Sequence, residues 1–104
     1  MNDILELVHT AASREILYLP HALRQMARPQ RRIRRVEIEA VVWKGTAIED
    51  YPDDVRGHSC LMSGVGQNAR PVHVVCAPKA EYLAIITAYL PAPERWDAEF
   101  RRRR

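Results

Sequence analysis

The chain is poor in several residue types, and each shortage excludes a class of protein. It contains two Cys, two Lys, four Gly and one Phe among 104 residues. Two cysteines, Cys60 and Cys76, do not amount to the disulfide framework of a small secreted domain, and we expect both to be reduced and buried. No Cys-x-x-Cys or His-x-x-His spacing occurs, so we predict no metal site and no cofactor. No apolar stretch reaches the roughly 18 residues of a membrane span.

The remaining composition is that of a globular protein. Hydrophobic residues make up 47% and charged residues 28% of the chain, which argues against intrinsic disorder. A length of 104 residues is enough for one hydrophobic core and too short for two ordinary domains. We predict one domain over residues 1–104, with a core from about residue 15 to residue 97 and a basic C-terminal tail at Arg101–Arg104. The first eight residues include Asp3 and Glu6 and do not resemble an export signal, so we expect a cytoplasmic protein.

Positive charge in this chain is almost entirely arginine and is concentrated in one segment. Arg accounts for 14 of the 16 basic residues, yet the formal net charge is only +3. No acidic residue lies between Leu19 and Val36, and this segment contains Arg24, Arg28, Arg31, Arg32, Arg34 and Arg35. A guanidinium group binds phosphate in a planar, bidentate geometry that an ammonium group cannot match. The segment therefore favours a polyanionic partner such as RNA, although a solvated charged surface is the common alternative.

The N-terminal part of the chain is predicted to be mainly helical. Residues 4–10 have a helical pattern, and residues 15–19 fit either a short strand or the approach to a second helix. Pro20 favours a first helical turn and Pro29 ends the pattern, which predicts a helix over residues 20–28. At about 100° per residue, one helix face displays His21, Arg24 and Arg28. The predicted buried positions of this helix are Ala22, Leu23, Met26 and Ala27.

The segment from Arg35 to Lys44 is compatible with two secondary structures. Its first hydrophobic residues alternate as in a strand, whereas Ile38, Val41 and Val42 form a helical stripe. Two early glutamates and the terminal Lys44-Gly45 match the electrostatic and conformational preferences of helix ends, so we predict a helix. Trp43 is predicted to belong to the core.

From Thr46 onward the hydrophobic period shortens to two, which predicts strands. The candidate strands are residues 47–51, 58–65, 71–77 and 82–90, separated by turn-forming residues. Helices followed by short strands indicate an α+β fold, with two or three N-terminal helices packed on a C-terminal antiparallel sheet of about four strands. In the last segment, residues 91–104, we expect Trp96 and Phe100 to anchor a short helix to the body.

Five short motifs occur in an order that resembles a known bacterial family, domain of unknown function 4258. They are His21-Ala22-Leu23-Arg24-Gln25-Met26, Arg32-Ile33, Ile48-Glu49-Asp50-Tyr51-Pro52, Arg70-Pro71-Val72-His73-Val74-Val75 and Ile85-Ile86-Thr87-Ala88-Tyr89. The resemblance covers roughly residues 16–96, nearly the whole domain. It implies a fold similar to the RelE and BrnT toxins, small ribonucleases with two N-terminal helices against an antiparallel sheet. It also implies an antitoxin protein as the partner that covers the basic face.

The positions that match the family's motifs nominate five catalytic side chains: His21, Arg24, His73, Thr87 and Tyr89. In metal-free RNA cleavage the 2′-hydroxyl loses a proton, a crowded phosphorane forms, and the leaving 5′-oxygen gains a proton. Histidine suits the proton transfers because its unperturbed pKa is about 6.5, and arginine suits the negative charge of the phosphorane. Tyr89 could donate a hydrogen bond or stack on a base, and Thr87 could bind a phosphate oxygen.

Strand parity gives a geometric condition for such a site. His73 lies on the opposite strand face from Val72 and Val74, while Thr87 and Tyr89 share one face. If the turn near Pro78 sets a suitable register, all three polar side chains project together. A slip of one residue would separate them.

The predicted function is a toxin-type, metal-independent endoribonuclease that cuts messenger RNA, on the ribosome or free. Its RNA would bind through the guanidinium groups of Arg28, Arg31, Arg32, Arg34 and Arg35. The alternatives are a catalytically silent RNA-binding or protein-interaction module of the same fold, and a purely structural domain. Each histidine also has an ordinary structural explanation, a ring bonded to a nearby backbone carbonyl. Salt-sensitive binding without product would favour the silent module, because neutralised phosphates release counterions.

Overall fold

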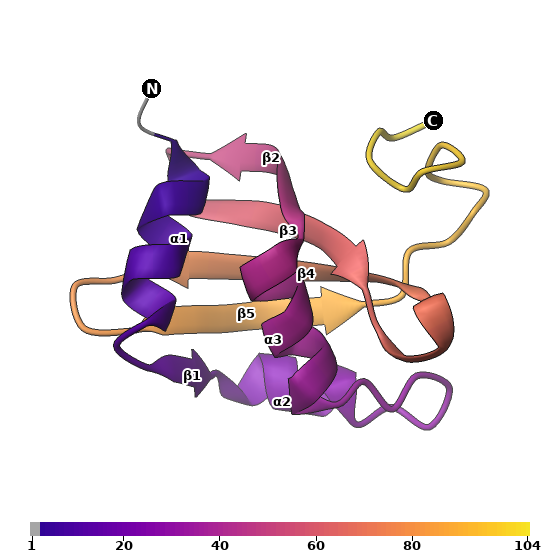
Figure 1. Cartoon of the computed structure of the whole chain (residues 1–104), viewed down its shortest axis with the longest axis horizontal. Helices are drawn as coiled ribbons and strands as arrows, with labels where there is room; N and C mark the ends of the chain where they lie inside the picture. Colours follow the sequence, from indigo (N-terminus) through magenta and orange to yellow (C-terminus); the bar gives the residue numbers. More distant parts are fainter. Residues whose placement is uncertain (1–2) are drawn as a thin grey trace.

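The computed structural model describes residues 3–104, which form three α-helices and five strands (Figure 1). Along the chain the elements are α1 (Ile4–Ala12), β1 (Ile16–Tyr18), α2 (Pro20–Met26), α3 (Arg35–Lys44), β2 (Thr46–Tyr51), β3 (Ser59–Val65), the 3-10 turn η1 (Gln67–Ala69), β4 (Pro71–Pro78) and β5 (Leu83–Tyr89). The predicted α+β class is confirmed. The segment whose sequence fitted a strand or a helix approach is the short strand β1.

The five strands form one mixed sheet in the order β1-β5-β4-β3-β2. The pairs β2–β3, β3–β4 and β4–β5 are antiparallel, as predicted, but β1 pairs in parallel with β5. The prediction of an antiparallel sheet of about four strands is therefore wrong on two points. The sheet has five strands, and its edge strand β1 runs parallel to its neighbour. β1 has only three residues, too few for hydrophobic alternation to reveal a strand or its partner.

α2 begins at Pro20, as predicted, and ends at Met26, two residues before the predicted end. Ala22 and Met26 are buried, but Leu23 is 39% exposed and Ala27 is also exposed, contrary to the predicted stripe. The helix lies beside β1 and packs on β5 near the edge of the sheet (Figure 1), so only a narrow stripe of its surface is covered.

α3 forms over the segment whose pattern fitted both a helix and a strand. Ile38, Val41 and Val42 are fully buried, so the helical stripe rather than the alternation describes this segment. The assignment of Trp43 to the core is wrong, because its side chain is 44% exposed. Trp43 instead stacks on the ring of His9 in α1, with 5.2 Å between the ring centroids. The Trp43 side chain therefore lies at the surface where α1 meets α3 and does not face the sheet.

The hydrophobic core lies between α1, α3 and one face of the sheet, the inner face (Figure 1). Ile4 and Val8 of α1 belong to it, so the core begins well before the predicted residue 15. Cys60 and Cys76 are free and buried, as predicted, with 4.0 Å between their sulfur atoms. No helix within residues 3–104 combines the length and the apolar character needed to cross a membrane.

The C-terminal segment, residues 91–104, contains no helix, contrary to the prediction. The Asp97 side chain accepts the backbone N–H groups of Glu99 and Arg101, which stabilises a turn instead of a helix. The segment leaves β5 and turns back along that end of the sheet (Figure 1). Trp96 is buried, as predicted for an anchor.

The four terminal arginines do not form a free tail. Arg103 pairs with Trp96 in an isolated antiparallel bridge, and its Nε lies 2.8 Å from Glu49 Oε2 in β2. The Arg104 side chain donates to the Pro93 carbonyl over 3.0 Å. These contacts hold the segment against the sheet and fix the side chains of Arg103 and Arg104.

Candidate active site

The outer face of the sheet, opposite α1 and α3, carries the predicted residues of β4 and β5. His73 pairs directly with Tyr89, and Thr87 pairs with Val75, the residue two positions after His73. The register therefore places His73, Thr87 and Tyr89 on one face, and the one-residue slip that would separate them does not occur. A bulge between Val75 and Cys76 lies next to this group, a common device for re-aiming side chains.

His73 is hydrogen-bonded through both ring nitrogens. Its Nε2 lies 2.7 Å from the Phe100 carbonyl oxygen, and its Nδ1 lies 3.2 Å from the Tyr89 hydroxyl. A carbonyl oxygen only accepts, so Nε2 carries the proton and donates it to Phe100. In the neutral ring, Nδ1 then accepts a hydrogen bond from the Tyr89 hydroxyl.

The C-terminal segment encloses His73 completely. The ring is 0% exposed and meets the buried Trp96 edge-on, with 4.5 Å between the ring centroids. Burial lowers the pKa of His73, although the Phe100 carbonyl and the Glu49 carboxylate act to raise it. Burial also raises the pKa of Tyr89. The His73–Tyr89 pair is therefore neutral near pH 7.

The tyrosine pocket, a hollow of about 460 Å³, lies beside this pair. It combines Tyr89 and Trp96 with three guanidinium groups, and its lining residues are Arg31, Tyr89, Leu90, Ala92, Glu94, Arg95, Trp96 and Arg103. Arg103 is partly neutralised, because it pairs with Glu49 and lies 4.7 Å from the centre of the Trp96 ring. Arg31 and Arg95 form no ion pair with a carboxylate within residues 3–104.

Arg31 reaches the tyrosine pocket from the arginine loop, residues 28–34 between α2 and α3. Its Nη1 donates to the Ala88 carbonyl at the end of β5 over 3.3 Å and approaches Gln25 Oε1 at 3.4 Å. These bonds point the guanidinium at the strand end that carries Tyr89. The neighbouring Arg32 has a left-handed backbone, with φ 49°, which turns the loop sharply after Arg31.

Arg70, at the end of η1, holds this loop in place. Its Nη1 donates to the Arg31 carbonyl over 2.9 Å, and its Nη2 donates to the Arg32 carbonyl over 3.3 Å. The same guanidinium binds both carboxylate oxygens of Glu37, at 2.9 and 2.7 Å. Glu37 is 3% exposed and also accepts the backbone N–H groups of Arg34 and Gln67. The Glu37–Arg70 clamp thus fixes the backbone on which Arg31 is carried.

The other predicted residues lie elsewhere. His21, Arg24 and Arg28 are exposed on or just after α2 and do not line the tyrosine pocket, and half-buried Thr87 does not line it either. The predicted arginine surface is divided between two hollows. A second one, the loop groove of about 450 Å³, is lined by Leu23, Met26, Ala27, Arg32, Ile33, Arg34 and Arg35.

Several residues that shape the site were not found from the sequence. Glu37 was assigned only to the dipole of α3, and Arg103 only to a basic tail. Arg95, Arg70 and Phe100 were not predicted to contribute. The run of arginines at the C-terminus indicated positive charge there but not that Arg103 would reach the site. A backbone carbonyl such as that of Phe100 cannot be recognised in a sequence, because every residue has one.

Comparison with known families assigns the chain. The family model described as "Domain of unknown function (DUF4258)" matches residues 18–90. The protein belongs to this family. The matched region contains the Glu37–Arg70 clamp, Arg31, His73 and Tyr89, whereas the C-terminal segment lies outside it. No curated protein and no solved structure matches the chain.

The arrangement offers two chemical capacities. Guanidinium groups of the tyrosine pocket can bind a phosphate, and the half-buried aromatic ring of Tyr89 can contact a base. The Tyr89 hydroxyl can pass a proton to a neutral imidazole that already accepts its hydrogen bond. Within residues 3–104, no three side chains of His, Cys, Asp or Glu gather in a group able to hold a metal ion.

Proposed function

We propose that this protein is a metal-independent endoribonuclease whose reaction centre is the tyrosine pocket. The observation that carries the proposal is the position of Tyr89. Its hydroxyl donates to the neutral His73 ring and lies in a pocket that also holds Arg31, Arg95 and Arg103. A proton acceptor reached through Tyr89 and positive charge in the pocket meet two of the three requirements of cleavage by a 2′-hydroxyl, and water meets the third, protonation of the 5′-oxygen.

The proposed reaction transfers one proton through Tyr89. The RNA 2′-oxygen bonds to the adjacent phosphorus, while its proton moves to the Tyr89 oxygen and the Tyr89 proton moves to His73 Nδ1. The bond between phosphorus and the 5′-oxygen breaks, and that oxygen takes a proton from water. The products are a 2′,3′-cyclic phosphate and a 5′-hydroxyl, and the guanidinium groups stabilise the phosphorane between them. The imidazolium donates to the Phe100 carbonyl and faces the Glu49 carboxylate until its proton returns through Tyr89 to the hydroxide left by that water, which regenerates water and the neutral ring.

The proposal includes a toxin role. The RelE-like and BrnT-like character implied by the motifs would make messenger RNA the substrate, on the ribosome or free in the cytoplasm, and an antitoxin the partner. The loop groove supports such a partner, because an apolar floor with Leu23 and Met26 is rimmed by Arg32, Arg34 and Arg35. An acidic amphipathic segment has the matching chemistry.

A second candidate function is RNA binding without cleavage. The complete burial of His73 favours it, because both ring nitrogens are already occupied by Phe100 and Tyr89. In that case the guanidinium groups hold phosphate, and the Tyr89–His73–Phe100 chain serves to fix the tyrosine ring. Both candidates use the tyrosine pocket, and they differ only in whether product forms.

One experiment separates the two candidates. Cleavage of a labelled RNA is followed in EDTA for the native chain, for Tyr89→Phe and for the matched variant Tyr82→Phe. Binding of an RNA with methylated 2′-hydroxyls is measured in parallel. We expect Tyr89→Phe to lose about 100-fold or more of the cleavage rate while keeping RNA affinity, and Tyr82→Phe to behave as the native chain.

The outcomes are exclusive. Binding without product in every variant supports the silent RNA-binding module. Cleavage that survives Tyr89→Phe removes Tyr89 from the reaction. Neither binding nor cleavage by a folded native chain contradicts both functions. Growth arrest and loss of messenger RNA on induced expression in a bacterial host would test the toxin role, with Tyr89→Phe as the control.

A further inference from the structure

A second polar hollow, the hydroxyl pocket, lies away from the tyrosine pocket. It measures about 240 Å³ and is lined by Ala40, Lys44, Gly45, Thr46, Ser63, Gly64, Val65 and Arg101. The two pockets share no lining residue. The lining contains two cationic side chains, two hydroxyl groups and no carboxylate, which is the composition of an anion site.

The hydroxyl groups are placed by the sheet. Thr46 and Ser63 are register partners where β2 and β3 pair at their end, so their side chains stand next to each other on the outer face. Ser63 Oγ donates to the Phe100 carbonyl over 3.3 Å. This bond uses the one proton of the hydroxyl, leaves the lone pairs of Oγ unused and directs the side chain toward the C-terminal segment. The pair therefore presents two adjacent hydroxyls at one spot.

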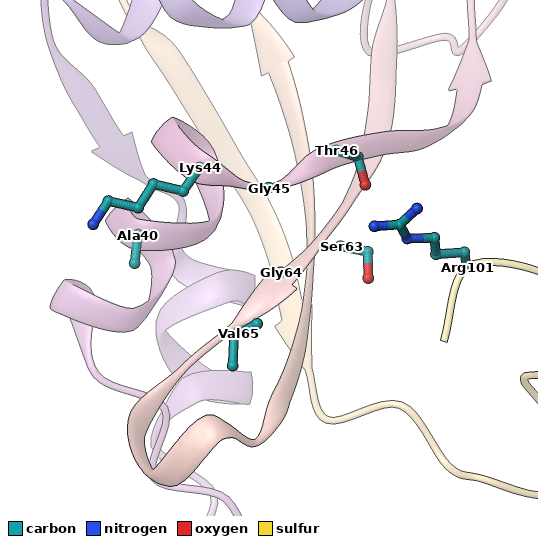
Figure 2. A pocket seen from close by; sticks show the side chains of 8 residues that line it. All are labelled: Ala40, Lys44, Gly45, Thr46, Ser63, Gly64, Val65 and Arg101. Atoms are coloured by element: carbon teal, nitrogen blue, oxygen red, sulfur yellow. The ribbon is translucent and has the colours of Figure 1, made fainter. Parts of the chain in front are cut away.

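Arg101 of the C-terminal segment lies beside these two hydroxyl groups. Figure 2 shows its guanidinium beside the Thr46 and Ser63 side chains, with Lys44 extending on the other side of Gly45. The backbone N–H of Arg101 is fixed by Asp97 Oδ1 at 3.0 Å. Its guanidinium forms no ion pair with a carboxylate within residues 3–104, unlike that of Arg103. The guanidinium thus lies beside two hydroxyl-bearing side chains and has no carboxylate partner among the described residues.

Gly45 keeps the floor of the hydroxyl pocket open. A Cβ atom at this position would lie 2.5 Å from the Ser63 carbonyl oxygen and 2.6 Å from the Val41 carbonyl oxygen, so only glycine permits this approach of α3 to β3. Lys44 lies in the last turn of α3, where its charge also offsets the negative end of the helix dipole. Arg101 is therefore the main cationic group available to a ligand.

We propose that the hydroxyl pocket binds a phosphate group through Arg101 and Thr46, beside Ser63. The guanidinium contributes two parallel N–H donors and the Thr46 hydroxyl contributes a donor from a second direction, an arrangement that matches a tetrahedral oxyanion better than a planar carboxylate. The volume of about 240 Å³ lies below the roughly 300–1,000 Å³ of sites for drug-sized ligands, so the pocket fits a phosphate group rather than a whole nucleotide. The phosphate belongs either to an RNA backbone or to a small phosphate-bearing molecule.

The test follows backbone amide shifts of Thr46, Ser63 and Arg101 by NMR in the folded native chain. The probes are inorganic phosphate, adenosine monophosphate and a short RNA with methylated 2′-hydroxyls. We expect saturable shifts, a loss of affinity of about tenfold or more in Arg101→Gln, and a much smaller loss in Arg102→Gln, which removes the same charge next to the pocket. Thr46→Val is the second variant and should also weaken binding.

The probes identify the source of the phosphate. Shifts with RNA alone assign the pocket to an internucleotide phosphate, whereas shifts with inorganic phosphate or the monophosphate assign it to a small ligand. Shifts with none of the three probes, or equal losses in Arg101→Gln and Arg102→Gln, overturn the proposal. The outcome is independent of ribonuclease activity, because none of the probes is cleaved and no residue of the hydroxyl pocket takes part in the proposed reaction.

Discussion

Glu37 and Arg70 form the least exposed ion pair among residues 3–104, with 2.7 Å between Glu37 Oε1 and Arg70 Nη2. The pair joins the first turn of α3 to the turn before β4, and Arg70 also binds two carbonyls of the arginine loop. The loop that carries Arg31 therefore depends on a carboxylate that does not itself line the tyrosine pocket. Its integrity should be sensitive to pH.

Acid should weaken the fold through Glu37. Burial raises the pKa of Glu37, but the Arg70 guanidinium and two backbone N–H groups outweigh it and lower the pKa to about 2. A carboxyl whose pKa is depressed in the folded state contributes its stability above its ordinary pKa of about 4.3 and loses it as the pH falls toward 2. We expect Glu37→Gln to cost about 3 kcal/mol at pH 7, because it leaves Arg70 without a carboxylate, and much less at pH 2.

Urea unfolding of both chains between pH 7 and pH 2 measures this difference. Glu81→Gln, a matched change at an exposed position, should leave the pH profile unchanged. An equal cost of Glu37→Gln at both ends of the range would show that the ion pair contributes nothing to the acid sensitivity.

The His73 ring should be neutral and protonated on Nε2. The Phe100 carbonyl fixes this tautomer, and burial lowers the pKa of the ring below its ordinary value. The folded state then binds fewer protons than the unfolded state, so stability falls as the pH drops below about 6.5. Nitrogen chemical shifts of the labelled ring should show a protonated Nε2 and an unprotonated Nδ1 throughout pH 6.5–8. A protonated Nδ1 in the neutral ring would contradict the hydrogen bond from Tyr89.

Arg31 should matter more for RNA binding than an arginine on α2. Arg31 lines the tyrosine pocket and is held by the Ala88 carbonyl, whereas Arg24 is exposed and lines neither arginine-rich hollow. We expect Arg31→Gln to weaken RNA binding about tenfold and Arg24→Gln to have a small effect that disappears at higher salt. Fluorescence anisotropy with an RNA carrying methylated 2′-hydroxyls at two salt concentrations measures both. Similar losses in the two variants would indicate that RNA binds by diffuse charge alone.

Most of the fold follows from local patterns. Pro20 predicted the start of α2, and the stripe of Ile38, Val41 and Val42 predicted α3 in spite of an alternating start. Four of the five strands follow from a period of two. β1 was only one of two alternatives for residues 15–19, because three residues carry no period, and its parallel pairing could not be predicted, because parallel partners are distant in sequence.

The site was less predictable than the fold. Parity placed His73, Thr87 and Tyr89 on one face, because alternation along a strand depends only on the sequence. It could not reveal that residues 91–104 cover His73, since this segment has no regular structure and contributes a backbone carbonyl. It also could not divide the arginine segment between two hollows, because that division depends on the turn at Arg32 and on the clamp by Arg70.

The matched family region stops one residue after Tyr89, before the segment that encloses His73. Two chains could thus share His73 and Tyr89 and still differ in the basicity of the imidazole. In this chain Trp96 packs against the ring and shields it from water, and the Phe100 carbonyl fixes its tautomer. In this chain the residues after β5 therefore set the environment of the imidazole, although the family match does not reach them.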